Sequence, residues 1–285
     1  MKQFILNEKA VELPEGWEDV SFRQFVSFSK LIGGFKERKE VKEGDEVAQW
    51  ERTLLDLRDN TKVLSFWSGL DESEVSLLDL DLATEVMKQL DFISEAYDPI
   101  HIDSFKIGDE RFFLPTELMA KSSFGRYIEA EQLELQANML KTGQIEILPK
   151  QIAILCKKST EEEKLDDDVI EKRAKLFEDL DMATIWDVGF FFGKVRAEID
   201  TRFPNLSGEE GGDPKAVIAA KDTINGYGWL NSLYEVAKEG VFNLPEYSPI
   251  DSVLNTELYK VLTYLSWKTA GATFERLLNE LHTKK

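Results

Sequence analysis

Three side chains in this sequence are of the types that most often do acid–base or nucleophilic chemistry near neutral pH. They are His101, His282 and Cys156, because the 285 residues include only two histidines and one cysteine. We identify no partner in the sequence that would make either histidine a general base. Cys156 ends an apolar helical segment, so we expect a buried structural thiol, although the two lysines after it could stabilise a thiolate. We therefore expect no catalytic residue and no enzyme.

Two acidic runs are the candidates for a metal site, Glu161 to Glu163 and Asp166 to Asp168. A calcium loop needs alternating oxygen ligands around a central glycine, and the second run has neither. Negative charge is favoured in the first turn of a helix, and this explains the run better. The sequence predicts no metal.

Two glycine pairs, Gly33-Gly34 and Gly211-Gly212, are the candidates for a phosphate-binding loop. Neither follows a buried strand or precedes a Lys-Ser or Lys-Thr pair, and their surroundings are acidic. We interpret both as loops and predict no cofactor.

The charge of the chain is strongly negative, with 35 Lys and Arg against 54 Asp and Glu, a net charge of −19. Residues 217–285 hold 7 Lys and Arg and 8 Asp and Glu, so −18 of this charge lies in residues 1–216. Such a surface repels nucleic acid and anionic lipid, and no stretch approaches the roughly 20 apolar residues of a membrane span. We expect no nucleic-acid or membrane partner. One cysteine and no signal-peptide core are typical of a reducing cytoplasm.

The hydrophobic pattern predicts a mainly α protein, a multi-helix bundle with one or two small β-hairpins. A hairpin is expected near 102–114, with Phe105, Ile107 and Phe112 or Phe113 on its apolar face, and a second one within residues 1–13. Ser21 with Gln24 predicts a capping box, and Asp181 a further helix cap. The predicted helices are residues 22–32, 47–59, 62–68, 82–97 (capped by Asp81 or Thr84), 124–140, 148–156, 169–180, 182–199, 216–236 with a break near 225–228, and 256–281 interrupted at Gly271.

Composition also suggests how the chain is divided. Residues 205–216 have the clearest linker composition, rich in Gly, Asp and Glu. We therefore predict an acidic, mainly helical domain over 1–204, a linker over 205–216 and a C-terminal helical region over 217–285.

Two aromatic clusters could contact a partner protein, because Trp and Tyr dominate the energetics of protein interfaces. The clusters are residues 186–192 and 225–234. Three successive phenylalanines, residues 190–192, cannot all face one side of a helix. The predicted partner-binding residues are Trp186, Phe190, Phe191, Tyr227 and Trp229. The alternative is that these rings pack inside the fold.

Three stretches of the sequence resemble a broad group of tailed-bacteriophage proteins, often from phages of Bacteroidetes. They are Leu13-Pro-Glu-Gly-Trp-Glu-Asp-Val-Ser-Phe-Arg-Gln-Phe; Glu171-Lys-Arg-Ala-Lys-Leu-Phe-Glu-Asp-Leu with Asp187-Val-Gly-Phe-Phe-Phe; and Tyr227-Gly-Trp-Leu-Asn-Ser-Leu-Tyr-Glu-Val-Ala with Ile250-Asp-Ser-Val-Leu-Asn-Thr-Glu-Leu. The resemblance implies a structural or tail-assembly protein, and it carries over no catalytic residue.

The function expected is that of a non-enzymatic phage assembly factor, similar to a tail assembly chaperone. An acidic surface with aromatic patches can cover apolar surface on an unassembled partner while the complex stays in solution. Its partners would be phage structural proteins, such as the tape measure or tail proteins, in the cytoplasm of the infected bacterial host. Two alternatives stay open: a structural component of the virion, or an acidic mimic of DNA that inhibits a host protein.

Overall fold

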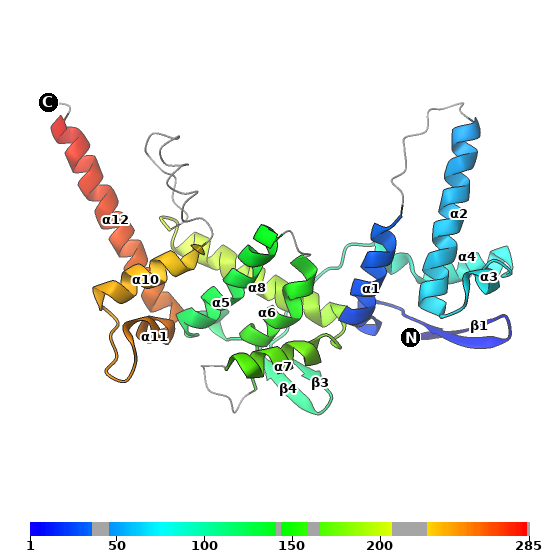
Figure 1. Cartoon of the computed structure of the whole chain (residues 1–285), viewed down its shortest axis with the longest axis horizontal. Helices are drawn as coiled ribbons and strands as arrows, with labels where there is room; N and C mark the ends of the chain where they lie inside the picture. Colours follow the sequence, from blue (N-terminus) through cyan, green and yellow to red (C-terminus); the bar gives the residue numbers. More distant parts are fainter. Residues whose placement is uncertain (36–45, 141–143, 159–165, 207–226, 284–285) are drawn as a thin grey trace. The chain divides into compact units, whose positions relative to one another are not determined.

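The computed structural model describes residues 1–35, 46–140, 144–158, 166–206 and 227–283 (Figure 1). Within these ranges the chain is mainly helical, with two antiparallel two-stranded hairpins, which confirms the predicted fold class. The hairpins are β1 (Lys2–Leu6) with β2 (Lys9–Leu13), and β3 (Ser104–Ile107) with β4 (Glu110–Phe113). The α-helices are α1 (Phe22–Gly33), α2 (Glu46–Ser68), α3 (Glu72–Val75), α4 (Leu80–Gln89), α5 (Phe124–Leu140), α6 (Leu148–Leu155), α7 (Asp167–Phe177), α8 (Met182–Arg202), α10 (Trp229–Glu239), α11 (Pro249–Leu254) and α12 (Leu258–Thr283).

The chain forms two compact units. The first consists of Met1–Pro99 with Glu178–Trp186, and the second of Ile100–Phe177 with Asp187–Lys285. The units therefore meet in sequence at Pro99, before Glu178 and inside α8. Residues 207–226 lie outside the described residues, so the predicted linker stays a prediction.

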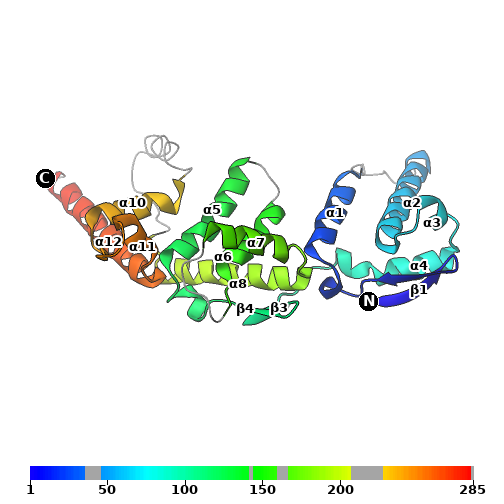
Figure 2. The same ribbon diagram turned by 60° about the horizontal axis from the view of Figure 1, so that its bottom comes forward.

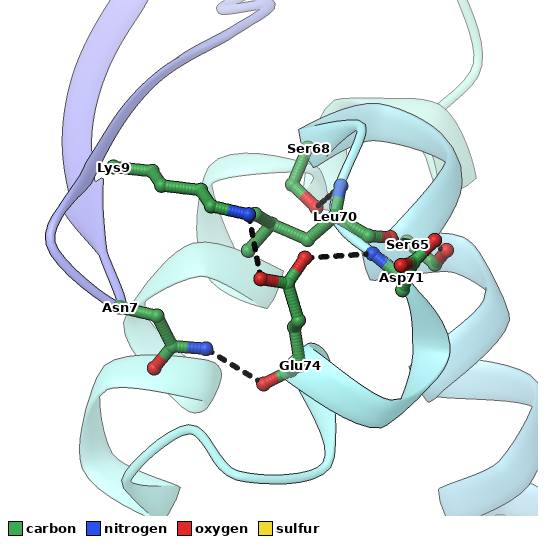
Figure 3. A network of polar contacts seen from close by, with 7 residues as sticks. All are labelled: Asn7, Lys9, Ser65, Ser68, Leu70, Asp71 and Glu74. Carbon is green, nitrogen blue, oxygen red and sulfur yellow. Dashed lines mark hydrogen bonds and ion pairs between the residues drawn. The ribbon is translucent and has the colours of Figure 1, made fainter.

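In the first unit, the β1–β2 hairpin turns at Asn7 and Glu8, which have φ angles of 46° and 66°. Positive φ at both central residues is the pattern of a two-residue hairpin turn. Two contacts join this turn to α3: Asn7 Nδ2 donates to the Glu74 carbonyl at 2.8 Å, and Lys9 Nζ lies 2.6 Å from Glu74 Oε1 (Figure 3). The Glu74 carboxylate also accepts from the Asp71 N–H at 3.2 Å, so one side chain links the hairpin to the start of α3.

Residues 178–186 belong to the first unit because they pair with the chain around Val20. The Phe22 N–H donates to the Leu180 carbonyl and the Met182 N–H to the Val20 carbonyl, both at 2.8 Å. Ser21 forms the predicted capping box with Gln24 on one side of this pairing. On the other side, the Asp181 carboxylate accepts from the Thr184 N–H at 2.8 Å, which confirms the second predicted cap.

The core of the first unit contains an aromatic cluster centred on Trp17, a buried side chain. Trp17 makes edge contacts with Phe25, Phe92 and Trp186 at centroid distances of 5.5, 5.1 and 4.6 Å. Edge-to-face pairs of this kind add stability beyond the area they bury. The cluster therefore holds together α1, the segment after α4 and the first turn of α8.

In the second unit, the β3–β4 hairpin packs on α7. Phe105 and Phe112 are buried and contact Phe177 at centroid distances of 5.4 and 4.8 Å. Phe113 is 37% exposed, so Phe112 is the member of that pair on the apolar face. The backbone of Phe113 pairs instead with Lys157, just after α6, through N–H···O distances of 2.8 and 3.1 Å.

Helix α5 is the centre of the second unit and contacts α6, α10, α11 and α12. Phe124 and Ile128 on α5 are buried, and Leu258, Val261 and Leu262 bury the first turns of α12. In both views α5 lies between α6 and α7 on one side and α10 and α11 on the other (Figures 1 and 2).

Several predicted boundaries were wrong. The predicted gap between residues 59 and 62 does not exist, because α2 is one helix of 23 residues and Thr61 Oγ1 bonds the Leu57 carbonyl within it. Gly271 does not interrupt α12, since one glycine costs a helix only about 1 kcal/mol. No helix was predicted between residues 236 and 256, but α11 lies there, with Ser248 as its cap and Pro249 in its first turn.

The helix predicted over 82–97 also differs. Helix α4 begins at Leu80 and ends at Gln89, and its cap is Asp79, which accepts from the Asp81 N–H at 2.9 Å. A short 3₁₀ turn, Asp91–Ser94, follows and places Phe92 against Trp17. The tertiary contact outweighs helix propensity here. The part of the predicted 216–236 helix before Tyr227 lies outside the described residues.

We predict that Trp17→Ala lowers the free energy of unfolding by about 3–5 kcal/mol, because it removes the ring at the centre of the cluster and leaves a cavity. Urea unfolding followed by circular dichroism measures this. Phe190→Ala is the control, since Phe190 is 40% exposed and its loss should cost less than about 1 kcal/mol. Equal effects of the two variants would contradict the role given to Trp17.

Candidate functional site

The structure separates the three reactive side chains. His101 is exposed and its Nε2 lies 3.1 Å from Asp103 Oδ1, while His282 is exposed near the end of α12. Cys156 is fully buried, and burial raises the pKa of its thiol to about 12, against a smaller opposite effect of the charges on Arg126 and Arg173. A neutral buried thiol is a poor nucleophile. Cys156 therefore has the structural position expected from the sequence.

The second acidic run begins a helix, as the sequence indicated. The Asp166 carboxylate accepts from the Asp168 N–H at 3.0 Å, and the Asp166 carbonyl accepts from the N–H groups of Val169 and Ile170. Within the described residues, no group of three or more His, Cys, Asp or Glu side chains converges as a metal site would require. The run Glu161 to Glu163 and the pair Gly211-Gly212 lie outside the described residues. Gly33 and Gly34 end α1.

The predicted partner-binding residues do not form one surface. Trp186 is half-buried in the aromatic cluster of the first unit, and Phe191 is buried in the second. Trp229 is half-buried and contacts Phe124 and Tyr127. Phe190 and Tyr227 are exposed, at 40% and 55%. Their role in binding stays a prediction, with Phe190 and Tyr227 the most accessible of the five.

A groove in the second unit, not identified from the sequence, is the strongest candidate for a functional site. Its volume is about 520 Å³, within the range of typical ligand sites. Helix α5 forms its floor, α6 and α7 one wall, and α10 and α11 the other. The residues that line it are Ile128, Glu129, Gln132, Leu133, Gln136, Lys150, Ile154, Asp167, Ile170, Glu171, Leu230, Leu233, Tyr234, Ile250 and Leu254. We call this the α5 groove.

The wall of the α5 groove that α10 and α11 form packs closely against α5 at Gly125. A Cβ at Gly125 would lie 3.1 Å from the Leu254 carbonyl oxygen and 3.2 Å from the Leu254 side chain. With a larger residue at position 125, α11 would have to move by a few tenths of an ångström from the start of α5. At the other helix of the wall, Gly228 has a φ of 47°, and a Cβ there would lie 3.0 Å from Gln132 Nε2. Gln132 in turn donates to the Tyr227 carbonyl at 2.8 Å.

The interior of the α5 groove is apolar and its edge is charged. Ile128, Ile154, Ile170 and Leu233 are almost fully buried beneath it, whereas Tyr234 and Ile250 are 55% and 37% exposed. The charged residues of the edge are Glu129, Asp167, Glu171 and Lys150. Lys150 and Glu171 form an ion pair, and the hydrogen bond from Lys150 lowers the pKa of the Glu171 carboxyl. Three carboxylates against one lysine make the edge acidic.

Another part of α5 carries a charged network that the sequence also did not reveal. Arg196 of α8 donates to Glu131 at 2.5 Å and to Glu134, and its guanidinium lies 4.6 Å from the centroid of the Phe192 ring. Burial raises the pKa of the Glu131 carboxyl, and Arg196 offsets only part of this effect. Burial likewise raises the pKa of Tyr127 beside it. The network ties α8 to α5.

Sequence reasoning missed the α5 groove because its residues come from five helices. The sequence of α10 does indicate one part of the groove, because Leu230, Leu233 and Tyr234 have the spacing of one helix face. That spacing predicts a half-buried face but not what lies opposite it. Comparison with protein-family models, curated proteins and solved structures finds no match for this chain. None of the described helices is long and apolar enough to span a membrane.

We predict that Cys156 reacts with a thiol reagent such as dithionitrobenzoate only after the protein unfolds. At about pH 8 a free thiol with an ordinary pKa near 8.5 reacts readily, whereas a buried thiol with a raised pKa is protonated and shielded. Labelling should be complete in denaturant and slow by orders of magnitude in native buffer. Fast native labelling would contradict the burial of this thiol.

We also predict a pH-dependent cost of Arg196→Met. Without Arg196 the pKa of Glu131 rises further above its value in the unfolded chain, so the folded state binds this proton more tightly. A carboxyl group whose pKa is higher in the folded chain than in the unfolded chain adds stability at pH values below its pKa in the unfolded chain. This stability is lost as the pH rises through its pKa in the folded chain. The variant should be less stable than the parent by about 1–3 kcal/mol at about pH 7 and by less at about pH 4. The cost at pH 7 is modest because solvent screens a partly exposed network.

Chemical denaturation at both pH values measures this difference. Arg52→Met is the matched control, because Arg52 is exposed and lies 4.0 Å from one carboxylate, Asp56. A cost for Arg196→Met that is the same at both pH values would show that Glu131 is not the group involved.

Proposed function

We propose that this chain is a non-enzymatic assembly factor of a tailed phage, similar to a tail assembly chaperone, that holds an apolar helical segment of an unassembled phage structural protein. The observation that carries the proposal is the α5 groove, an apolar surface left open between α6–α7 and α10–α11. The sequence resemblance to tailed-phage proteins supports the choice of partner, and the tape measure or tail proteins are the candidates. The site of action would be the cytoplasm of the infected bacterial host.

The dimensions of the α5 groove favour a helix as its occupant. The floor runs along α5 from Ile128 to Gln136, about 12 Å at 1.5 Å per residue. Two turns of an amphipathic helix cover the same length and present apolar side chains at positions i, i+3, i+4 and i+7. The apolar side chains of the groove, among them Leu133, Leu230 and Ile250, would contact that face, and the polar face would stay in water.

The acidic edge favours a partner segment with basic residues beside its apolar face. Glu129, Asp167 and Glu171 would attract such residues, and Lys150 is already paired with Glu171. The net charge of −19 keeps a complex with an apolar segment in solution and raises the rate at which a basic partner arrives. Both properties suit a protein that protects a partner before assembly.

The placement of the reactive residues is consistent with a role in binding. Cys156 is buried and neutral, and the Asp166 to Asp168 run begins a helix. The DNA-mimic alternative predicts a basic host protein as the partner, and the structural-component alternative predicts that the chain is present in mature virions, so partner capture and virion analysis together separate the three.

The experiment compares two double variants of the full chain during phage infection of its host. Tyr234→Glu with Ile250→Glu places two carboxylates in the α5 groove at exposed positions. Tyr247→Glu with Val241→Glu makes the same changes at 44% and 50% exposed positions that do not line the groove. We expect a photo-crosslinker at Gln136 to capture a phage structural protein in the parent and the control. Capture should fall at least about tenfold in the groove variant.

Other outcomes would overturn the proposal. Equal capture by both variants would exclude the α5 groove as the binding site. Recovery of a basic host protein alone, lost at high salt, would favour the DNA mimic. A fixed copy number of the chain in purified mature virions, by mass spectrometry, would favour the structural component, because an assembly factor is expected to be absent from them.

A further inference from the structure

The C-terminal half of α12 is exposed to solvent. Helix α12 has 26 residues, and its first turns are buried through Leu258, Val261 and Leu262. Every described residue from Ala270 to Thr283 is exposed. We call residues 267–283 the α12 tip. Isolated helices of this length are marginal in water, so a partner would stabilise this helix.

The α12 tip carries large apolar side chains on one face. Phe274, Leu277, Leu278 and Leu281 are 63%, 48%, 39% and 65% exposed, and they stand at positions i, i+3, i+4 and i+7. Trp267, 70% exposed, extends the same face by one heptad. The opposite face is polar, with the Arg276–Glu280 ion pair on it. An exposed apolar stripe of this size marks a contact surface.

We propose that the α12 tip of one copy of this chain binds in the α5 groove of a second copy. The spacing of the four anchors is that of a helix recognised by a groove. They span seven residues, about 10 Å, and the groove floor is about 12 Å long. The tip is an exposed helix face with large apolar side chains, and the groove is a concave surface of the same unit.

Charge also favours this pairing. Lys268 is held by Glu235 and Glu239 on α10. The remaining residues 269–285 carry 3 Lys and Arg and 2 Asp and Glu, a small positive charge in a chain of −19. The edge of the α5 groove has three carboxylates and one lysine. The α12 tip itself carries two basic and two acidic side chains, so this positive charge comes from Lys284 and Lys285, which follow the tip in the sequence.

The α12 tip does not reach the groove of its own chain. No α12 residue is among those that line the α5 groove, and α12 runs without interruption from its buried base to the exposed tip. A straight helix fixed at one end cannot return to α5. The contact is therefore between copies, and each copy supplies one tip and one groove.

The consequence for the α5 groove is regulation by self-association. This inference rests on the groove of the proposed function but not on the identity of the phage partner. A second copy would cover the apolar groove until a tighter-binding segment displaces its tip. Self-association and partner binding then exclude each other at each groove.

The test uses purified full-length chain alone, so its failure leaves the phage proposal untouched. The tip variant is Leu277→Glu with Leu281→Glu, and its charge-matched control is Asn279→Glu with Thr283→Glu on the polar face. The groove variant is Tyr234→Glu with Ile250→Glu, and its control is Tyr247→Glu with Val241→Glu. Circular dichroism melts of each variant confirm that it is folded, which is expected because all these side chains are at least partly exposed.

Sedimentation velocity over a range of concentrations gives the outcome. We expect the parent and both controls to self-associate, and the dissociation constant to rise about thirtyfold or more in the tip variant and in the groove variant. An equimolar mixture of the tip variant and the groove variant should form a one-to-one dimer and stop there, because it has one intact tip and one intact groove.

Two results would overturn the inference. If the groove variant associates as the parent does while the tip variant is monomeric, the tips pair with each other and the groove is not their site. If the parent itself stays monomeric at all concentrations up to about 100 μM, the α12 tip does not bind a second copy, because any weaker association would not cover the groove.

Discussion

Helix α5 packs against α6, α10, α11 and α12, and at its start Gly125 lies in close contact with Leu254 of α11. With α11 held against the start of α5, and α10 held through Gly228 and Gln132, the opposite wall of α6 and α7 is left separated from them. The α5 groove is the space that this packing leaves. A side chain at residue 125 would push α11 outward and change the wall that carries Ile250 and Leu254.

Charge and apolar surface are distributed differently along the chain. Most of the acidic excess lies in residues 1–216. Where carboxylates are partly buried, as at Glu131 and Glu134, Arg196 is placed between them. The large exposed apolar side chains of α12 lie in the nearly neutral part of the chain.

The sequence predicted local structure well where the signal was itself local. The two hairpins, the Ser21–Gln24 capping box and the Asp181 cap each depend on residues within a few positions of one another, and all are present. Predictions were wrong where a glycine or a proline was taken to end a helix regardless of its position in the helix. Gly271 lies within α12 and Pro249 starts α11, because one glycine is tolerated in a helix and proline fits the first turn. The early end of α4 depends on the contact of Phe92 with Trp17, which is distant in sequence.

The sequence by itself therefore determined the fold class, the hairpins, the acidic character and the buried place of Cys156, since these follow from composition and from short-range periodicity. Only the tertiary structure decided which apolar residues remain open to a partner. Residues of five helices, from Ile128 to Leu254, meet at the α5 groove, and the sequence gives no register between helices that are far apart in the chain. The α12 tip shows the same limit. Its periodicity is visible in the sequence, but a buried helix face and an exposed one have the same pattern until the fold shows what covers it.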